Sequence, residues 1–194
     1  MILKNLFRRR TRTLVTILGI SIGVAAIIAL GEMTTLLENG YTSMMAGSKS
    51  DLVLSQPNTF DVNYSAVDQA IGPKLAAMPE VEAVSGMLQG IVQTPANPFF
   101  FVFGYPDHSF LLERFQLIEG DSLDEAFRRS QRGKPLLLGA AAAEALKKAP
   151  GDSLHLGNSL YRVVGIYRTG GAFEDRGAVL ALSDAQVLLD RPNK

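Results

Sequence analysis

The tetrapeptide Gly-Asp-Ser-Leu occurs twice, at Gly120–Leu123 and at Gly151–Leu154, and it is the pattern that most suggests covalent chemistry. A serine can act as a nucleophile when a base lies within hydrogen-bond reach and a third group orients that base. His155 follows Ser153 by two positions, so a β-strand would place both side chains on one face. The sequence offers no clear third group, and Pro150 before Gly-Asp favours a turn. We therefore predict turns and keep ester hydrolysis as a remote alternative.

Metal and nucleotide chemistry have less support. The two histidines, His108 and His155, stand far apart with no acidic ligand pattern around them. The absence of cysteine excludes disulfides, thiol catalysis and cysteine-type zinc sites. No Gly-x-x-x-x-Gly-Lys-Ser/Thr occurs, so the chain lacks that route to a nucleotide phosphate. We predict no catalytic residue, no metal site and no directly bound cofactor, with a GDSL-type esterase as the remote exception.

The segment Thr13–Gly31 organises the rest of the chain. It contains no charged residue and no proline, and its polar members are threonine, serine and glycine. A bilayer-spanning helix needs roughly 20 mostly apolar residues, and the apolar side chains here surround the helix rather than form one stripe. We predict a transmembrane helix over residues 13–31.

Two other interpretations of this segment remain. One is a buried helix of a soluble domain, which the clustering of basic residues at one end disfavours. The other is a signal peptide cleaved before Glu32, with Ala29 and Gly31 at positions −3 and −1 of the cleavage site. The apolar run is longer than the usual signal core of about 7–15 residues, which disfavours cleavage.

The charges that flank the segment predict its orientation. Glu32 and Glu38 follow it, and five basic residues with no acidic residue precede it: Lys4, Arg8, Arg9, Arg10 and Arg12. By the positive-inside rule, residues 1–12 are cytoplasmic and the main domain is extracytoplasmic, or periplasmic, in a chain held in the cell (inner) membrane. The N-terminal segment is also amphipathic, so it serves either as an elbow for a cytoplasmic partner or only as a topological anchor at the lipid bilayer.

The remaining 182 residues carry 14 basic and 19 acidic residues, a net charge of −5. A mildly acidic domain argues against nucleic acid as a partner, because neutralising phosphates requires a basic face.

Residues 32–46 continue the helical pattern without proline. Apolar side chains recur there at spacings of three and four. At about 1.5 Å per residue, a helix from Thr13 to Met45 would reach roughly 50 Å, more than the bilayer core. We predict an extracytoplasmic stalk whose stripe packs on the chain's own domain or on a second helix. The residues of this stripe to which we assign stalk packing are Met33, Leu37, Tyr41 and Met44.

Residues 47–194 are expected to form a mixed α/β domain, so that the whole chain is α+β with one long N-terminal helix. We predict strands at Asp51–Ser55, Val81–Val92, Phe99–Tyr105, Pro135–Leu138 and Gly177–Leu182, and a hairpin of Leu154–Leu156 with Ser159–Tyr167 across Gly157-Asn158. Helices are expected over residues 66–78, 109–115, 123–129 and 140–148, and after Ser183, with Ser183 and Gln186 forming a capping box.

Two runs of this sequence resemble one known family. Asn5–Leu30 (NLFRRRTRTLVTILGISIGVAAIIAL) is similar to the first membrane helix of MacB/FtsX-type ABC transporter permeases. Lys134–Leu189 resembles the end of the extracytoplasmic core domain of that family, with its LLG helix, GDSL turn, RVVGIYRTG strand and final helix. The order and the separation of the two runs also agree with the family.

The resemblance implies a non-catalytic permease subunit that works beside a cytoplasmic ABC ATPase, which uses the ATP. The stalk would carry ATP-driven motion to the outer domain, for export or extraction of a substrate such as a macrolide, peptide or lipoprotein. The implied partners are that ATPase, a second permease copy or paralogue in a dimer, and a periplasmic adaptor or carrier.

One departure from the family pattern leaves alternatives open. Such permeases usually have four membrane helices, three of them near the C-terminus, and this sequence has one apolar span. We therefore expect an incomplete core domain, belonging either to the front portion of a longer permease or to a split or degenerate subunit. A single-span membrane-anchored binding or sensor module is the alternative function.

Overall fold

The computed structural model describes residues 10–47, 50–58, 65–94, 97–128, 133–171 and 173–194, with side chains described from residue 11 to residue 35 and from residue 50 onward. The chain divides into two compact units, Met1–Ser43 and Met44–Lys194. We describe each unit by itself.

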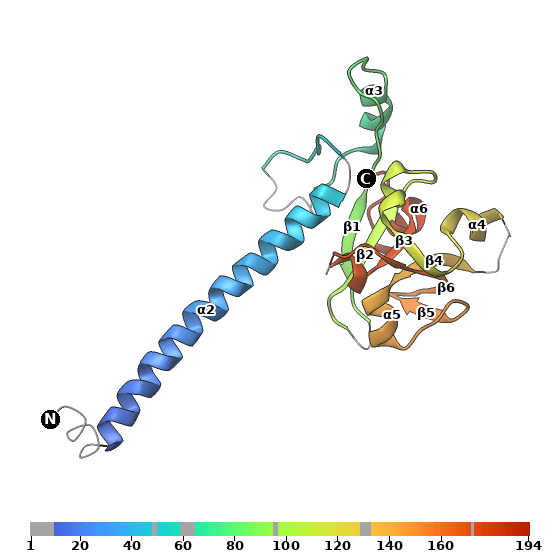
Figure 1. Cartoon of the computed structure of the whole chain (residues 1–194). Coiled ribbons are helices and arrows are strands. Elements are labelled where there is room, and N and C mark those ends of the chain that lie inside the picture. Colours follow the sequence, from blue (N-terminus) through green and yellow to red (C-terminus); the bar gives the residue numbers. More distant parts are fainter. Residues whose placement is uncertain (1–9, 48–49, 59–64, 95–96, 129–132, 172) are drawn as a thin grey trace. The chain divides into compact units, whose positions relative to one another are not determined.

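The first unit is dominated by one continuous helix, α2 (Arg10–Gly47, 38 residues) (Figure 1). Its residues Thr11–Thr35 are long and apolar enough to cross a membrane, with a mean hydropathy of 2.5, and none of this window is buried within the chain. No other described helix meets the same criteria. The continuation of α2 beyond residue 31 agrees with the expected helical pattern, whereas the division into span and stalk stays a prediction.

The second unit is built on a seven-stranded sheet. Six strands follow one another along the path β1-β2-β7-β4-β6-β3, and the seventh, β5, pairs with β6 off this path. The strands are β1 (Leu88–Val92), β2 (Phe100–Tyr105), β3 (Gln116–Gly120), β4 (Lys134–Gly139), β5 (Ser153–Leu156), β6 (Ser159–Arg168) and β7 (Ala178–Ala181). The pairs β2–β7 and β4–β6 are parallel, and the other pairs are antiparallel.

Helices cover both faces of this sheet. One apolar core lies under α5 (Ala140–Leu146) and α6 (Leu182–Leu188), to which Ala142, Ala143 and Ala185 contribute. The other lies under the 3-10 helix η3 (Phe110–Arg114) and the helix α4 (Leu123–Arg128). Close packing requires glycine at position 104 of β2, because a Cβ there would overlap the methyl group of Ala185. The expected α+β class, a long apolar helix followed by a mixed domain, is confirmed.

Several predicted elements are also confirmed. Leu156 pairs with Ser159 across Gly157-Asn158, which is the predicted hairpin. The phenylalanine-rich run forms β2, an inner strand between β1 and β7, with five of its six residues buried. A strand buried on both faces explains why this run lacks polar alternation.

Other predictions were wrong. Asp51–Ser55 is not a strand, and Leu52 is 90% exposed. The helix expected over residues 66–78 is broken into η2 (Gln69–Ile71) and the short helix α3 (Gly72–Ala76), where Pro73 is tolerated because it lies in the first turn.

The predicted capping box of the last helix was also wrong. Helix α6 begins two residues earlier than predicted, with Ala181 instead of Ser183 as its N-cap and no side-chain cap. Gln186 instead donates hydrogen bonds to Gln69 and to the backbone of Lys194. The predicted strand over Val81–Val92 is confined to β1, and β3 was not predicted.

Candidate functional site

Three threonine hydroxyls of the candidate membrane span bond to the backbone of their own helix. The hydroxyls of Thr16, Thr34 and Thr35 donate to the backbone carbonyls of the residues four positions earlier, at 2.9, 3.0 and 3.1 Å. These bonds matter because the hydrocarbon region of a bilayer offers no water to an unpaired hydroxyl. The part of α2 from Thr11 to Thr35, with its exposed apolar side chains, is therefore suited to a lipid environment.

The predicted orientation and stalk residues lie mostly outside the described side chains. Lys4, Arg8 and Arg9 precede the described part of the chain, and only the backbone of Arg10 is described. Arg12 is exposed near the start of α2. Met33 is 61% exposed, and the side chains of the other three stalk residues, Leu37, Tyr41 and Met44, are outside the described set. Their roles stay predictions.

The first Gly-Asp-Ser-Leu copy caps a helix. The backbone N–H of Ser122 donates to Oε2 of Glu125 at 2.9 Å, and the backbone N–H of Glu125 donates to the Ser122 hydroxyl at 3.3 Å. This reciprocal pair is the capping box of α4. Gly120, with φ of +83°, makes the preceding turn. Ser122 therefore has a structural role that explains the motif without catalysis.

The second copy forms a turn before β5. Oδ2 of Asp152 accepts a hydrogen bond from the backbone of Ala149 at 2.9 Å. Ser153 and His155 are exposed on one face of β5, as the alternation predicts. Their partners on β6 are Arg162 and Leu160, neither of which can serve as the carboxylate that orients a catalytic imidazole.

The two histidines are not brought together as a metal site. His108 lies in a turn with φ of +59°, and its Nδ1 is 3.3 Å from Oδ2 of Asp124, with the imidazole 84% exposed. Among the residues that the structure describes, no group of three or more potential ligand side chains could hold a metal ion.

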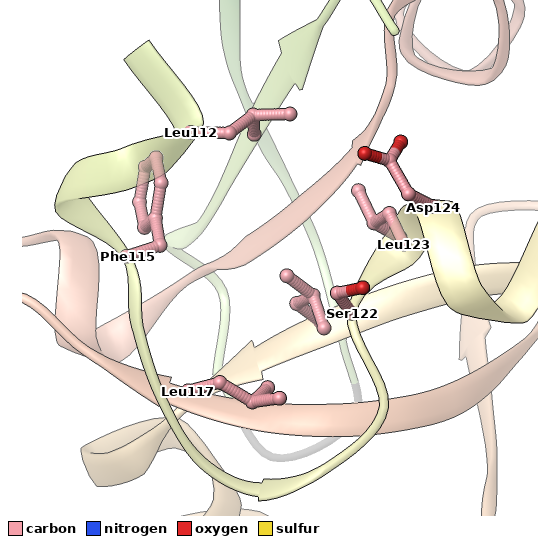
Figure 2. A pocket seen from close by; sticks show the side chains of 7 residues that line it. Leu112, Phe115, Leu117, Ser122, Leu123 and Asp124 are labelled. Atoms are coloured by element: carbon pink, nitrogen blue, oxygen red, sulfur yellow. The ribbon is translucent and has the colours of Figure 1, made fainter. Parts of the chain in front are cut away.

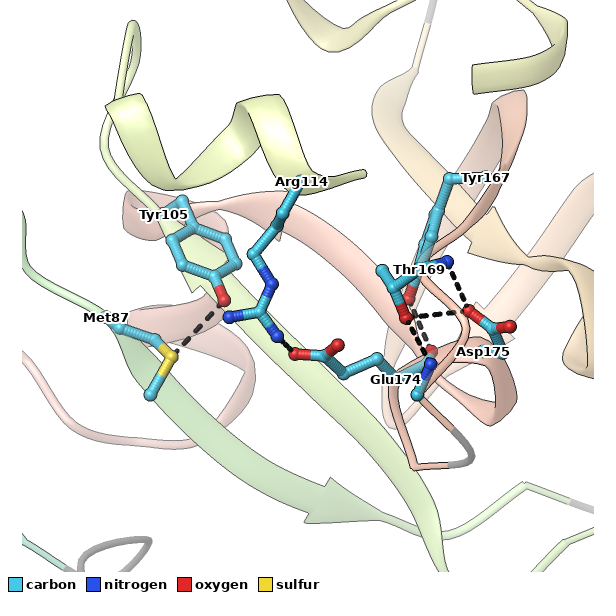
Figure 3. A network of polar contacts seen from close by, with 8 residues as sticks. Met87, Tyr105, Arg114, Tyr167, Thr169, Glu174 and Asp175 are labelled. Atoms are coloured by element: carbon cyan, nitrogen blue, oxygen red, sulfur yellow. Dashed lines mark hydrogen bonds and ion pairs between the residues drawn. The ribbon is translucent and has the colours of Figure 1, made fainter. Parts of the chain in front are cut away.

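A buried polar network, which the sequence analysis did not identify, joins the loops around β2, β6 and β7 (Figure 3). The guanidinium of Arg114 on η3 forms an ion pair with the carboxylate of Glu174, and both side chains are almost fully buried. Glu174 belongs to the 3-10 helix η4 (Glu174–Arg176), and the Tyr167 hydroxyl donates to its backbone carbonyl at 2.6 Å. Sixty residues separate the two charges, so no local pattern could reveal the pair.

Aspartate and tyrosine side chains complete this network. Oδ1 of Asp175 accepts from the backbone N–H and the hydroxyl of Thr169, at 2.7 and 2.9 Å. Burial raises the pKa of Tyr105 to about 12 and that of Tyr167 well above its usual value. Burial also lowers the pKa of Arg114, although an arginine stays charged in proteins. Since both phenols remain protonated, they act as hydrogen-bond donors, and the arrangement suits fixing loops rather than proton transfer.

The domain also contains a small cavity, which is lined by Leu112, Phe115, Leu117, Ser122, Leu123, Asp124 and Leu137 (Figure 2). Its volume is about 90 Å³. Pockets for drug-sized ligands are commonly about 300–1,000 Å³. Of its polar lining groups, Ser122 is engaged in the capping box and Asp124 contacts His108. We therefore interpret the cavity as a packing feature rather than a substrate site.

One known family matches both the apolar helix and the mixed domain. The family model of the MacB-like periplasmic core domain matches residues 13–193. The chain belongs to this family. The resemblance noted in the sequence to MacB/FtsX-type ABC transporter permeases is thereby confirmed, and this domain type is a component of such permeases.

Two solved structures are similar to this MacB-like chain. The periplasmic region of MacB from Actinobacillus actinomycetemcomitans is 16% identical, with a TM-score of 0.47, over 66% of this chain and 63% of that one. The extracellular domain of the noncanonic ABC-type transporter YknZ from Gram-positive bacteria is 14% identical, with a TM-score of 0.48, over 64% of this chain and 67% of that one. The chain thus spans less than two thirds of the MacB periplasmic region. No curated protein sequence matches it.

Proposed function

We propose that this chain is a permease subunit of an ABC transporter, or the N-terminal portion of one. The observation that carries the proposal is the family match over residues 13–193, which begins in the apolar helix and continues through the sheet domain. An apolar helix in which the hydroxyls of Thr16, Thr34 and Thr35 donate to the helix's own backbone supports the membrane location. The chain would act by transmitting motion rather than by making or breaking bonds.

The proposed topology follows the charge pattern. Residues 1–12 would lie in the cytoplasm, residues 13–31 would cross the inner membrane, residues 32–46 would form the stalk, and residues 47–194 would form an extracytoplasmic core domain. The orientation depends on the five basic residues Lys4, Arg8, Arg9, Arg10 and Arg12. Residues 13–194 carry a net charge of −5, so the excess of basic over acidic residues is confined to the N-terminal segment.

The energy source in this proposal is another polypeptide. The sequence lacks a phosphate-binding Gly-x-x-x-x-Gly-Lys-Ser/Thr loop, so a separate cytoplasmic ATPase would bind and hydrolyse ATP, and this chain would bind no cofactor. The stalk side chains would pack against a second permease copy or a paralogue and carry the motion outward. A periplasmic adaptor or carrier would complete the assembly.

The substrate would be moved by the assembled domains rather than enclosed by one of them. The 90 Å³ cavity is far smaller than a macrolide, a peptide or a lipoprotein, which are the substrate types we propose. The outer domain would therefore contact the substrate with its surface and push, extract or guide it. This distinguishes the proposal from a receptor that binds its ligand within a deep pocket.

Copurification tests the proposal against a single-span binding or sensor module. The tagged full chain is extracted from its native membrane in mild detergent and purified, and its partners are identified by peptide mass spectrometry. We expect a stoichiometric polypeptide with a phosphate-binding loop and vanadate-sensitive ATP hydrolysis. Purification of the intact chain without an ATPase, after extraction and chemical crosslinking in the membrane, would overturn the permease proposal and favour the sensor module.

A further inference from the structure

Residues 66–85 form an arm that precedes the sheet and buries none of its own residues. The arm contains η2 and α3, and neither helix has a buried member. Met78, just after α3, is 50% exposed. The first buried residue that follows is Leu88, which opens β1 and is 3% exposed. The arm therefore adds no fully buried side chain to either apolar core, and hydrophobic burial holds it only weakly.

Polar contacts attach the start of the arm to the end of the chain. The backbone N–H of Gln69 donates to the carbonyl of Asn193 at 3.1 Å. Nε2 of Gln186 donates both to Oε1 of Gln69, at 3.1 Å, and to the carbonyl of Lys194, at 2.9 Å. Gln186 projects from α6, which is fixed in the core by the buried Ala185. One amide group thus joins two segments 125 residues apart to an anchored helix.

A second attachment holds the other end of the arm. The hydroxyls of Ser85 and Ser109 are 2.6 Å apart, and the Ser109 hydroxyl also accepts from the backbone N–H of Leu111 at the start of η3. Helix η3 carries Arg114, whose ion pair with Glu174 is buried. The arm is therefore fastened at both ends to parts of the molecule that are themselves fixed, by bonds that are partly or fully exposed.

We infer that residues 66–85 are a releasable strap, clasped at Gln186 and at Ser109, that opens as a local unit while the sheet stays folded. Hydrogen bonds that compete with water contribute little each, and segments without apolar burial open at low free-energy cost. In the sequence, the strap lies between the candidate membrane span and β1. A displacement of the residues that precede the strap would therefore be transmitted along the backbone to β1 through the strap. The strap itself does not depend on the proposed transport function.

Hydrogen exchange on the full chain in nanodiscs tests the clasp. Two substitutions, Gln186→Glu and Gln186→Met, keep the length of the side chain and remove its amide donor. We expect exchange at the amides of Gln69 and Ala77 to accelerate roughly fivefold to thirtyfold, the effect of losing one or two hydrogen bonds. Exchange in β4 and β7 should not change, because no residue of the strap belongs to either apolar core.

Gln116→Glu is the matched control, since it makes the same chemical change on the exposed strand β3. It should leave the strap unaffected. Unchanged exchange in the strap of both Gln186 variants would overturn the inference. So would equal acceleration in β4 and β7, which would mean that the strap is not a separate unit, and so would acceleration in the glutamate variant alone, which would indicate a charge effect. None of these results bears on whether the chain copurifies with an ATPase.

Discussion

At the scale of single residues, the polar groups of this domain are used to fix loops. Ser122 caps α4 and Asp152 closes a turn, although both belong to a motif that could have been catalytic. Arg114 and Glu174 form the most deeply buried charge pair described, and Tyr167 donates to the backbone of the same glutamate. Such a pair contributes little net stability by itself, but the removal of one partner leaves an uncompensated buried charge.

The Arg114–Glu174 pair gives a prediction at this scale. Glu174→Leu should lower the free energy of unfolding of the domain by about 3–5 kcal/mol, because Arg114 would lose its counter-charge in a buried position. The double variant Arg114→Met with Glu174→Leu should recover most of that loss, since neither charge then remains. Urea unfolding followed by near-ultraviolet circular dichroism of the tyrosines measures both, as the chain has no tryptophan. A single variant as stable as the double variant would contradict the prediction.

At the scale of elements, the sequence was informative where local chemistry determines structure. The hairpin turn at Gly157-Asn158 and the apolar run of β2 were predicted correctly. Both depend on the types of a few consecutive residues, which can be identified in the sequence without knowledge of tertiary contacts. Strand β3 was missed because all five of its residues are exposed, so it has no apolar alternation. Leu52 and its neighbours look like a buried strand, but burial depends on a tertiary partner, and in this structure they are exposed.

The same limit applies to the candidate site. The Arg114–Glu174 pair and the Gln186 clasp join residues 60 and 117 positions apart, too far for a local sequence pattern. In neither pair does the sequence around one residue indicate which residue is its partner. The sequence therefore predicted the class of the domain, and the structure supplied the contacts that hold its loops.

The stalk gives a prediction at the scale of elements. Leu37→Asp or Met44→Asp would place a charge in the proposed apolar stripe, which is unfavourable when that stripe packs against another surface, so the ratio of substrate transported to ATP hydrolysed in proteoliposomes should fall about tenfold or more. Asn39→Asp is the control, because residue 39 lies on the opposite side of the helix from residue 37. Normal coupling in both stripe variants, at normal membrane abundance, would exclude a coupling role for the stripe.

At the scale of the whole molecule, an apolar helix and an α/β domain are joined in one chain without a catalytic centre that the described residues reveal. The family of MacB-like periplasmic core domains covers both parts, from residue 13 to residue 193. In the proposed function, the helix crosses the membrane and the domain lies on the extracytoplasmic side. That assignment depends on the basic residues before the helix more than on any contact within the domain.

The natural absence of cysteine permits a direct test of that topology, because a single introduced thiol is then unique. We expect a membrane-impermeant maleimide to label Ser153→Cys in intact spheroplasts, since Ser153 is exposed on β5. Asn5→Cys should be labelled only after the membrane is permeabilised, because the positive-inside rule retains the basic N-terminus in the cytoplasm. Both variants should carry the intact mass of the full chain. Labelling of Asn5→Cys in sealed spheroplasts, protection of Ser153→Cys, or a mature protein that begins at Glu32 would each contradict the proposed anchor, and with it the stalk and its coupling role.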